Sequence, residues 1–365
     1  MPNDLYYQVA LTMVPNIGAI QAKILADHFI TAENIFTAKK KDLECIEGIG
    51  SIKADSIKKF DNFKGAEAEL LFIEKYQIQA FFLTDNAYPK RLLGCYDPPT
   101  VLYYKGNADL NQTKIVSIVG TRHNSDYGRA LTEQLVEGLQ SLNVLVLSGL
   151  AYGIDAIAHK AAVHNNLSTV GVLAHGLHTI YPPAHEPLAK QMLHNGGLLT
   201  EFGKDTAPDR HNFPRRNRVV AGMADCTVVV ETAVKGGSMI TAELANGYNR
   251  DVFAYPGKTT DSRSTGCNHL IKNNKAILLT GPDDLVEQMG WVNKKKQPKV
   301  QRQLFLSLTP GQQLLVDILK EKDSLHVDEL FLKSGMSSSM VAATMLELEF
   351  ENIIASLPGK MYKLL

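Results

Sequence analysis

The sequence predicts an α/β protein whose middle region forms a doubly wound, mostly parallel β-sheet, with a helical region before it and a second small domain after it. The chain has 365 residues, enough for two or three domains, and 45% of them are hydrophobic, which suits a sizeable globular core. Seven short β-rich runs between residues 85 and 290 are each followed by an amphipathic helical run. The loops after these runs are rich in Gly, Ser or Arg.

The alternation in the middle region favours a parallel sheet, because a strand needs a crossover before the next parallel strand can pair with it. Helices then cover both faces, and ligands bind where the carboxyl ends of the strands gather. We predict strands over Lys114–Val119, Val144–Ser148, Thr169–Ala174, Gly197–Glu201, Thr227–Glu231, Val252–Tyr255 and Ala276–Leu279. We predict helices over Tyr127–Leu142, Ile154–Asn165, Ala184–His194, Arg216–Met223, Ser238–Tyr248 and Thr265–Asn273.

The first region, about residues 1–65, contains two similar phrases. Residues 14–25 read VPNIGAIQAKIL and residues 46–57 read IEGIGSIKADSI, and each has a turn ending in Ile-Gly followed by a helical run. The repeat resembles a tandem helix-hairpin-helix module, in which a glycine turn exposes backbone N–H groups at a helix start. Such a turn can hold a DNA phosphate without reading base sequence, or the module can only pack against partners. Both alternatives stay open.

The last region follows residues 291–308, which carry four lysines with little periodicity and predict an exposed basic linker. Residues 309–365 open with an N-cap and a proline, and then give three helical runs and a hairpin. This order resembles a winged helix. Its third helix, Met340–Glu349, carries Glu347 and Glu349 but no Arg or Lys. An acidic helix suits a DNA groove poorly, so we expect a protein-interaction or structural module.

Charge and cysteine content exclude several classes of protein. Lys and Arg total 38 and Asp and Glu total 38, so any affinity for nucleic acid must come from local basic clusters. The four cysteines are scattered without a CxxC pair, which argues against a zinc ribbon or a disulfide framework and favours a reducing compartment. The sequence shows no signal-peptide pattern and no apolar run long enough for a membrane span, so we expect a soluble, cytoplasmic protein.

Residues 213–218, Phe-Pro-Arg-Arg-Asn-Arg, give the strongest functional signal. An aromatic ring can stack on an unpaired base, and guanidinium groups donate paired hydrogen bonds to phosphate oxygens. Proline suits the first turn of a helix, whose free N–H groups also favour an anion. The alternative interpretation is a solvated, charged helix start.

Four loops after predicted strands strengthen the first interpretation, because small and hydroxyl residues let a backbone approach a phosphate. Their residues include Gly120, Ser148, Gly149, Gly237 and Ser238. The carboxyl ends of parallel strands share one edge, so we expect these loops and the 213–218 segment to form a phosphate-binding rim. Neither GxGxxG after the first strand nor GxxxxGK[ST] is present, and we therefore expect no nucleotide cofactor.

Together these motifs resemble the DNA-processing protein A family, also called DprA or Smf. The matching phrases run in order over about residues 85–290. They are Gly-Thr-Arg at 120–122, Tyr-Gly at 127–128, Ser-Gly-x-Ala-x-Gly-Ile-Asp at 148–155, Tyr-Pro at 181–182, Phe-Pro-x-Arg-Asn-Arg-x-x-Ala-Gly at 213–222, Val-Val-Glu at 229–231, Gly-Ser-Met-Ile-Thr-Ala at 237–242, Val-Phe-Ala-x-Pro-Gly at 252–257 and Leu-Ile at 270–271.

The resemblance implies a bacterial, cytoplasmic protein with an extended Rossmann-like fold that binds single-stranded DNA and is not an enzyme. Members dimerise, protect incoming DNA and load the recombinase RecA on it during natural transformation. The strand-binding residues carried over by position are Arg122, Arg210, Phe213, Arg216, Asn217 and Arg218. Members commonly have Lys at the position of Arg210, which keeps the charge but not the geometry.

With the changes of composition along the chain, the resemblance gives four segments. We expect a helical domain over 1–65, the strand-binding domain over 66–290, the linker over 291–308 and the winged helix over 309–365. The dimer interface, the surface that meets RecA and any duplex contact by the first domain are open.

Other interpretations compete with this one. The run from Glu231 to Glu243 is similar to a phrase of Rossmann-like phosphoribohydrolases, which release a base from a nucleoside monophosphate with a Glu and an Arg. Here, however, Val-Lys-Gly-Gly at 234–237 replaces their Pro-Gly-Gly. A third interpretation is a scaffold whose winged helix recruits partners. His175, His178 and His185 lie near one loop, but without a Cys or carboxylate in register we expect loop or core histidines and no metal.

Overall fold

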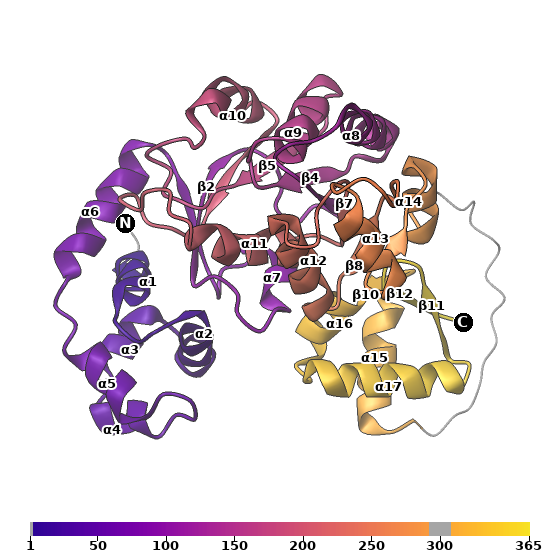
Figure 1. Cartoon of the computed structure of the whole chain (residues 1–365). Coiled ribbons are helices and arrows are strands. Elements are labelled where there is room, and N and C mark those ends of the chain that lie inside the picture. Colours follow the sequence, from indigo (N-terminus) through magenta and orange to yellow (C-terminus); the bar gives the residue numbers. More distant parts are fainter. Residues whose placement is uncertain (1–2, 292–307) are drawn as a thin grey trace. The chain divides into compact units, whose positions relative to one another are not determined.

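The computed structural model describes residues 3–291 and 308–365 of the chain. The chain divides into two compact units, residues 1–278 and 279–365, and each is described by itself (Figure 1). The first unit holds the N-terminal helices and the large sheet, and the second holds a three-stranded sheet with its helices. The basic linker expected over 291–308 lies, except for its end residues, outside the described residues.

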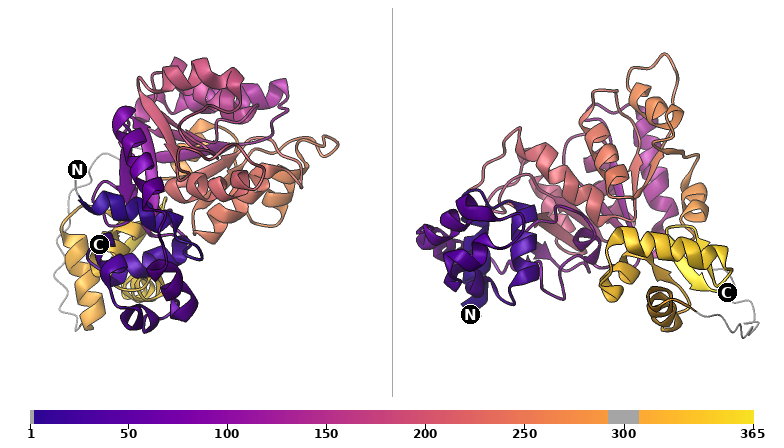
Figure 2. Two further views of the ribbon diagram at one scale, coloured as in Figure 1. Left: turned by 90° about the vertical axis from the view of Figure 1, so that its left-hand side faces the viewer. Right: turned by 90° about the horizontal axis from the view of Figure 1, so that it is seen from below.

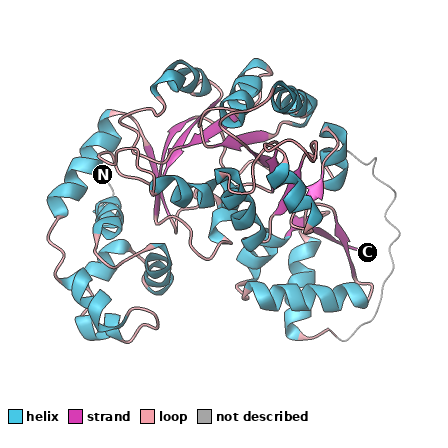
Figure 3. Ribbon diagram, in the orientation of Figure 1, coloured by secondary structure: helices cyan, strands magenta, loops and turns pink. Residues whose placement is uncertain are grey.

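A nine-stranded sheet forms the centre of the first unit, in the order β1-β2-β6-β5-β4-β3-β7-β8-β9. All strands from β3 to β9 run parallel to their neighbours in this group, whereas β2 pairs antiparallel with both β6 and β1 (Figure 3). The prediction of a doubly wound, mostly parallel sheet is therefore confirmed. The strands are β1 (Gln79–Phe82), β2 (Val101–Gly106), β3 (Ile115–Val119), β4 (Leu145–Ser148), β5 (Thr169–Val172), β6 (Gly196–Thr200), β7 (Cys226–Val229), β8 (Asp251–Ala254) and β9 (Ile277–Leu278).

The central strands are covered on both faces, which explains their continuous apolar sequences. β3 reads IVSIV, and all its residues are buried. β-branched side chains fit such a pleated, covered surface. The sequence prediction found β3 to β9 with small shifts at their ends, but it missed β1 and β2, which precede the strand–helix alternation on which it rested.

Helices cover both faces of the sheet (Figure 1 and Figure 2). Those that follow β3, β4 and β5 lie on one face, and those that follow β6, β7 and β8 lie on the other. The direction of winding changes between β3 and β7, which makes this point a topological switch. The first group is α8 (Asp126–Gly138), α9 (Ile154–His164) and α10 (Glu186–Met192), with the short 3-10 helices η1 (Gln140–Leu142) and η2 (Pro183–His185); the second is α11 (Asn212–Met223), α12 (Gly237–Gly247) and α13 (Thr265–Lys272).

The N-terminal region consists of short helices joined by glycine turns. Gly18 is the N-cap of α2, and Gly48 and Gly50 before and at the start of α5 have φ of 85° and 62°, a conformation that residues with a side chain rarely adopt. Both phrases therefore form a turn followed by a helix, as a helix-hairpin-helix requires. The helices are α1 (Asn3–Met13), α2 (Ala19–His28), α3 (Ala32–Thr37), α4 (Lys40–Glu44), α5 (Gly50–Lys58) and α6 (Phe63–Lys75).

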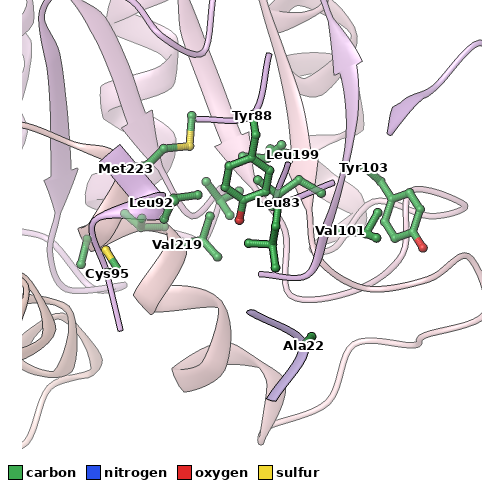
Figure 4. Close-up of a cluster of buried hydrophobic side chains, with 14 of the residues drawn as sticks. Ala22, Leu83, Tyr88, Leu92, Cys95, Val101, Tyr103, Leu199, Val219 and Met223 are labelled. Carbon is green, nitrogen blue, oxygen red and sulfur yellow. The ribbon is translucent and has the colours of Figure 1, made fainter. Parts of the chain in front are cut away.

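A continuous apolar core joins these helices to the sheet, and Figure 4 shows part of it. Tyr88 and Leu92, from the segment between β1 and β2, lie in this cluster with Val219 of α11. The short helix α7 (Lys90–Leu93) is held by Arg91, which donates to both carboxylate oxygens of Asp225 at 2.6 and 2.9 Å. Asp225 is buried and Arg91 is partly buried, and the pair ties the segment before β2 to the start of β7.

The second unit is a winged helix, as predicted. Thr309 caps α15 by accepting a hydrogen bond from the backbone N–H of Gln312 at 3.3 Å, and a core around Leu315 and Val341 joins the helices. On α17, Glu347 accepts a hydrogen bond from the Gln312 side chain at 3.2 Å. The elements are α14 (Pro282–Gln288), α15 (Pro310–Lys320), β10 (Leu325–His326), α16 (Val327–Ser334), α17 (Ser338–Phe350), β11 (Ile354–Leu357) and β12 (Met361–Leu364).

In the described parts of both units, none of the helices has the length and apolar character needed to cross a membrane.

Candidate nucleic-acid interface

A cavity of about 380 Å³ opens at the carboxyl ends of β3, β4 and β7, beside the topological switch. The loops after these strands form its sides, and the first turns of α11 close it. Crevices at this position are where doubly wound sheets bind ligands. The lining residues are Val119, Gly120, Thr121, Arg122, His123, Gly149, Ala151, Asp155, Phe213, Pro214, Arg216, Asn217, Val220, Thr232, Ala233, Gly236, Gly237, Ser238, Ile240 and Thr241.

Glycines and a buried carboxylate shape the loop after β3. A side chain on Gly120 would place its Cβ 2.5 Å from Cγ1 of Ile154, and one on Gly128 would place its Cβ 2.2 Å from Oε2 of Glu231. The backbone N–H of Ser125 donates to Glu231 Oε2 at 2.9 Å, and the Ser125 hydroxyl donates to the other carboxylate oxygen. Because the buried Glu231 is the second residue after β7, it fixes the loop after β3 across the switch point.

Arg122 and Phe213 face each other in the cavity lining. The guanidinium carbon of Arg122 lies 5.3 Å from the centroid of the Phe213 ring, a cation–π distance. Phe213, in the first turn of α11, is half-buried, whereas Arg122 is exposed. The pair therefore presents a partly fixed aromatic face beside an accessible cation, which suits the base and the phosphate of one nucleotide.

Arg216 lies in the cavity lining with only 5% of its surface exposed. Its Nη1 donates to the carbonyl oxygen of Gly149 at 2.6 Å and to that of Val172. Burial lowers the pKa of Arg216 to about 10, so the guanidinium stays charged at neutral pH. Asp155 accepts from the backbone N–H groups of Gly149 and Ala151 at 3.1 and 3.4 Å, and burial raises the pKa of this carboxyl. Together Arg216 and Asp155 hold the loop after β4 in place.

The loop after β7 brings the N-terminus of α12 to the cavity. Gly236 is the N-cap of this helix of 11 residues, and its own N–H donates to the carbonyl oxygen of Ala233 at 2.8 Å. A Cβ on Gly237 would meet no atom within 4 Å, so this position faces open space. The partial positive charge of the helix start therefore meets the cavity, where an anion is favoured.

Residues 79–290, more than half of the chain, match the DNA recombination-mediator protein A family. The chain belongs to this family. Residues 302–360 match the DprA winged helix domain, and residues 9–68 match the helix-hairpin-helix motif.

Relatives agree with this assignment over most of the chain. Protein Smf of a Synechocystis strain is 31% identical, over 98% of this chain and 98% of that protein. The X-ray structure of DNA processing protein A from Streptococcus pneumoniae is 31% identical, has a TM-score of 0.65, and covers 78% of this chain and 98% of its own. The structure of the Helicobacter pylori protein, described as showing its single-stranded DNA binding mode, is 29% identical with a TM-score of 0.53 and covers 57% and 94%.

In this member of the family, the structure brings most of the predicted site residues together. On α11 the lining residues follow helical spacing: Phe213, Arg216, Asn217 and Val220 stand at i, i+3, i+4 and i+7. The loops contribute the others. The predicted residues that line the cavity are Gly120, Arg122, Gly149, Phe213, Arg216, Asn217, Gly237 and Ser238.

Two predicted residues lie outside the cavity lining, and their side chains are engaged within the protein. Arg218 is 7% exposed and donates to the carboxylate of Glu201 and to the carbonyl oxygen of Asp97. The hydroxyl of Ser148 is buried and donates to the carbonyl oxygen of Ile118 at 2.6 Å. Because neither side chain lines the cavity and both are held within the protein, we place neither in the proposed site, and a DNA contact by either stays a prediction.

Arg210 also lies outside the cavity lining, but it is exposed. Its Nε donates to Nε2 of His211 at 3.2 Å, in the segment that leads into α11. A contact between Arg210 and a DNA strand stays a prediction.

Several residues that flank the predicted ones also line the cavity and were not predicted from the sequence, among them Thr121, His123, Thr232 and Thr241. Their signal was available, because each stands in or next to a glycine-rich loop after a predicted strand. Hydroxyl groups there supply further hydrogen-bond donors for a phosphate.

Two competing site interpretations gain no geometric support. Glu243, on which the phosphoribohydrolase interpretation depends, is exposed, lies outside the lining and stands 3.8 Å from Lys275 Nζ. Of the three histidines named for a metal site, His175 and His185 are buried; burial lowers the pKa of His175, and Nδ1 of His185 lies 2.9 Å from the carbonyl oxygen of Leu150. Within residues 3–291 and 308–365, no cluster of His, Cys, Asp and Glu could hold a metal ion.

Proposed function

We propose that this chain binds single-stranded DNA in the cavity at the carboxyl ends of β3, β4 and β7. The observation that carries the proposal is the Arg122–Phe213 pair, which lines the same cavity as the N-terminus of α12. A ring, a guanidinium and free backbone N–H groups together match the base and phosphates of a nucleotide. The described single-stranded DNA binding of the Helicobacter pylori relative supports the same substrate class.

The position of Phe213 favours an unpaired strand over a duplex. The ring lies in the cavity lining and is half-buried, so a base must enter the cavity to stack on it. Bases of a duplex are already stacked and paired, and moving one out costs a few kcal/mol. The chain has no net charge, so nonspecific attraction to the more highly charged duplex is weak.

We further propose that the protein is cytoplasmic, acts as a homodimer in natural transformation and recombination, protects incoming DNA and loads RecA on it. The support is membership in a family described as recombination mediators, together with relatives named as DNA-processing proteins. Loading is tested by the rate at which RecA covers one labelled strand with and without this protein. Dimerisation is tested by light scattering.

The experiment for the central proposal is a salt titration with a labelled single strand and a duplex of equal length. We expect tighter binding of the single strand at every salt concentration, and a linear fall of log affinity with log salt for both. Equal affinities for the two DNAs, or tighter binding of the duplex, would contradict the proposal.

Arg122→Ala should weaken single-strand binding and flatten the salt slope by about 0.7, the value for one phosphate contact. The reason is that Arg122 is the exposed cation beside Phe213 in the cavity lining. Arg129→Ala is the matched control, because Arg129 is also exposed, on the neighbouring α8, and does not line the cavity. Equal slopes for the wild-type protein and Arg122→Ala would remove Arg122 from the site.

A further inference from the structure

At the carboxyl edge of the sheet, the loops after β4 and β5 differ sharply in side-chain chemistry from the loops after β7 and β8. The loop after β6, which carries Lys204 and Arg210, belongs to neither pair. After β4 and β5, residues 149–153 and 173–185 contain no Lys or Arg, but they expose Tyr152 and Tyr181 by 48% and 45%. After β7 and β8, residues 230–237 and 255–264 expose Lys235, Lys258 and Arg263. The aromatic ring of this second group, Tyr255, is buried.

The exposed tyrosines are connected to the cavity rather than scattered. The Tyr181 ring centroid lies 6.1 Å from that of Phe213, in a tilted arrangement. The Tyr152 ring packs edge-on against the buried His185 at 5.0 Å, and His185 Nδ1 lies 2.9 Å from the carbonyl oxygen of Leu150. Since β4 and β5 are neighbours in the sheet, the loops that carry Tyr152 and Tyr181 leave the same edge of the sheet side by side.

The cationic side has the opposite character. Lys235 stands in the loop that ends at the N-terminus of α12, and Lys258 follows β8. Arg263 forms a partly exposed ion pair, with its Nε 3.6 Å from Oδ1 of Asp261. Ammonium groups attract phosphates but give a base no face on which to stack.

We infer that a DNA strand crosses this edge of the sheet in one orientation. Its bases point toward Tyr181 and Tyr152, and its phosphates point toward Lys235 and Lys258. The inference rests on the proposed function and adds a second base-binding surface beyond Phe213. The loops after β4 and β5 have no Lys or Arg with which to neutralise phosphates, whereas their aromatic faces bind any unpaired base. The Arg122–Phe213 pair lies where the two sides meet.

The test compares one fluorescent oligothymidylate with an abasic strand of the same length and charge. Tyr181→Ala should weaken binding of the oligothymidylate at least about fivefold, the lower limit for a lost base stack, and leave its salt slope unchanged. The same variant should bind the abasic strand as the wild-type protein does. Lys235→Ala should flatten the salt slope by about 0.7 on both strands, because both carry the phosphates.

Tyr181→Phe keeps the ring and should keep wild-type affinity. Tyr127→Ala is the control for exposure alone, because Tyr127 is 51% exposed and its hydroxyl donates to the carbonyl oxygen of Pro256, after β8. If Tyr181→Ala lowers the thermal unfolding temperature, Tyr152→Ala serves as a second test. We expect Tyr152→Ala to lose the same affinity for the oligothymidylate and none for the abasic strand.

Two outcomes overturn the inference and leave the proposed function standing. One is an equal loss on both strands for Tyr181→Ala and Tyr152→Ala, and the other is no loss on either strand while the wild-type protein still binds. A wild-type protein that shows no preference for single strands over duplex contradicts the proposed function itself.

Discussion

Arg218→Ala should lower the free energy of unfolding of the first unit by about 3 kcal/mol, near the lower end of the cost of breaking a buried ion pair. The Arg218 and Glu201 side chains are 9% and 4% exposed, and Arg218 also donates to the carbonyl oxygen of Asp97. Without Arg218, the Glu201 carboxylate stays buried, and its Oε1 already has no hydrogen-bond partner among the described residues. Urea unfolding followed by circular dichroism measures the loss.

Arg215→Ala is the matched control, because Nη2 of Arg215 forms a second ion pair with the same carboxylate oxygen at 3.0 Å. The Arg215 side chain is 58% exposed, so its removal should cost no more than about 1 kcal/mol. Because Arg215 remains as a second partner of Glu201, the stability cost of Arg218→Ala should stay near the lower end of the range for a broken buried ion pair. Below its unfolding transition, Arg218→Ala should bind single strands with wild-type affinity and salt slope. A flatter slope in a protein of unchanged stability would return Arg218 to the DNA site.

Sequence patterns predicted the arrangement of the central sheet because local and tertiary preferences agree there. β3 reads IVSIV, and its β-branched residues fit a strand covered on both faces. β1 and β2 escaped prediction because neither belongs to a parallel strand–helix–strand unit. They pair antiparallel at the edge of the sheet, and β2 meets β6, a partner about 95 residues further along the chain. A pairing so distant in sequence leaves no periodic signal near either strand.

Sequence spacing could predict which residues of the site cluster together, whereas only tertiary packing decides which of their side chains face the cavity. Sequence alone identified 213–218 as one functional cluster, yet a helix presents Arg216 and Arg218 about 200° apart. Helical spacing places Arg216 and Phe213 on the same face of the helix. It does not show which face of the helix meets the cavity. That choice follows from the buried Glu201, which attracts Arg218 away from the cavity, and no short motif links these two residues. Ser148 shows the same limit, because a hydroxyl at the end of β4 can serve a ligand or a backbone carbonyl.

Phe213→Ala should weaken single-strand binding by about 1–3 kcal/mol, the range measured when a base loses its aromatic stacking partner. The Phe213 ring lines the cavity, is half-buried, and contacts Arg122 and Tyr181. We therefore expect its removal to affect DNA binding more than folding. Stacking displaces no counterion, so the salt slope should stay close to that of the wild-type protein. Fluorescence anisotropy across a range of salt concentrations measures affinity and slope together.

Phe213→Tyr keeps an aromatic face and serves as the control, with affinity expected within about threefold of the wild-type value, since a ring for stacking is retained. The unfolding temperature of Phe213→Ala separates binding from packing. If Phe213→Ala lowers the free energy of unfolding as much as the free energy of DNA binding, Phe213 is a core residue. The proposed pairing of Arg122 with an aromatic ring at the DNA site would then be wrong. Combining Phe213→Ala with Arg122→Ala then measures their coupling, because residues in contact give non-additive losses. If the two residues hold the same nucleotide, the double variant should lose less affinity than the sum of the single losses, whereas strictly additive losses would mean that they act on separate parts of the strand.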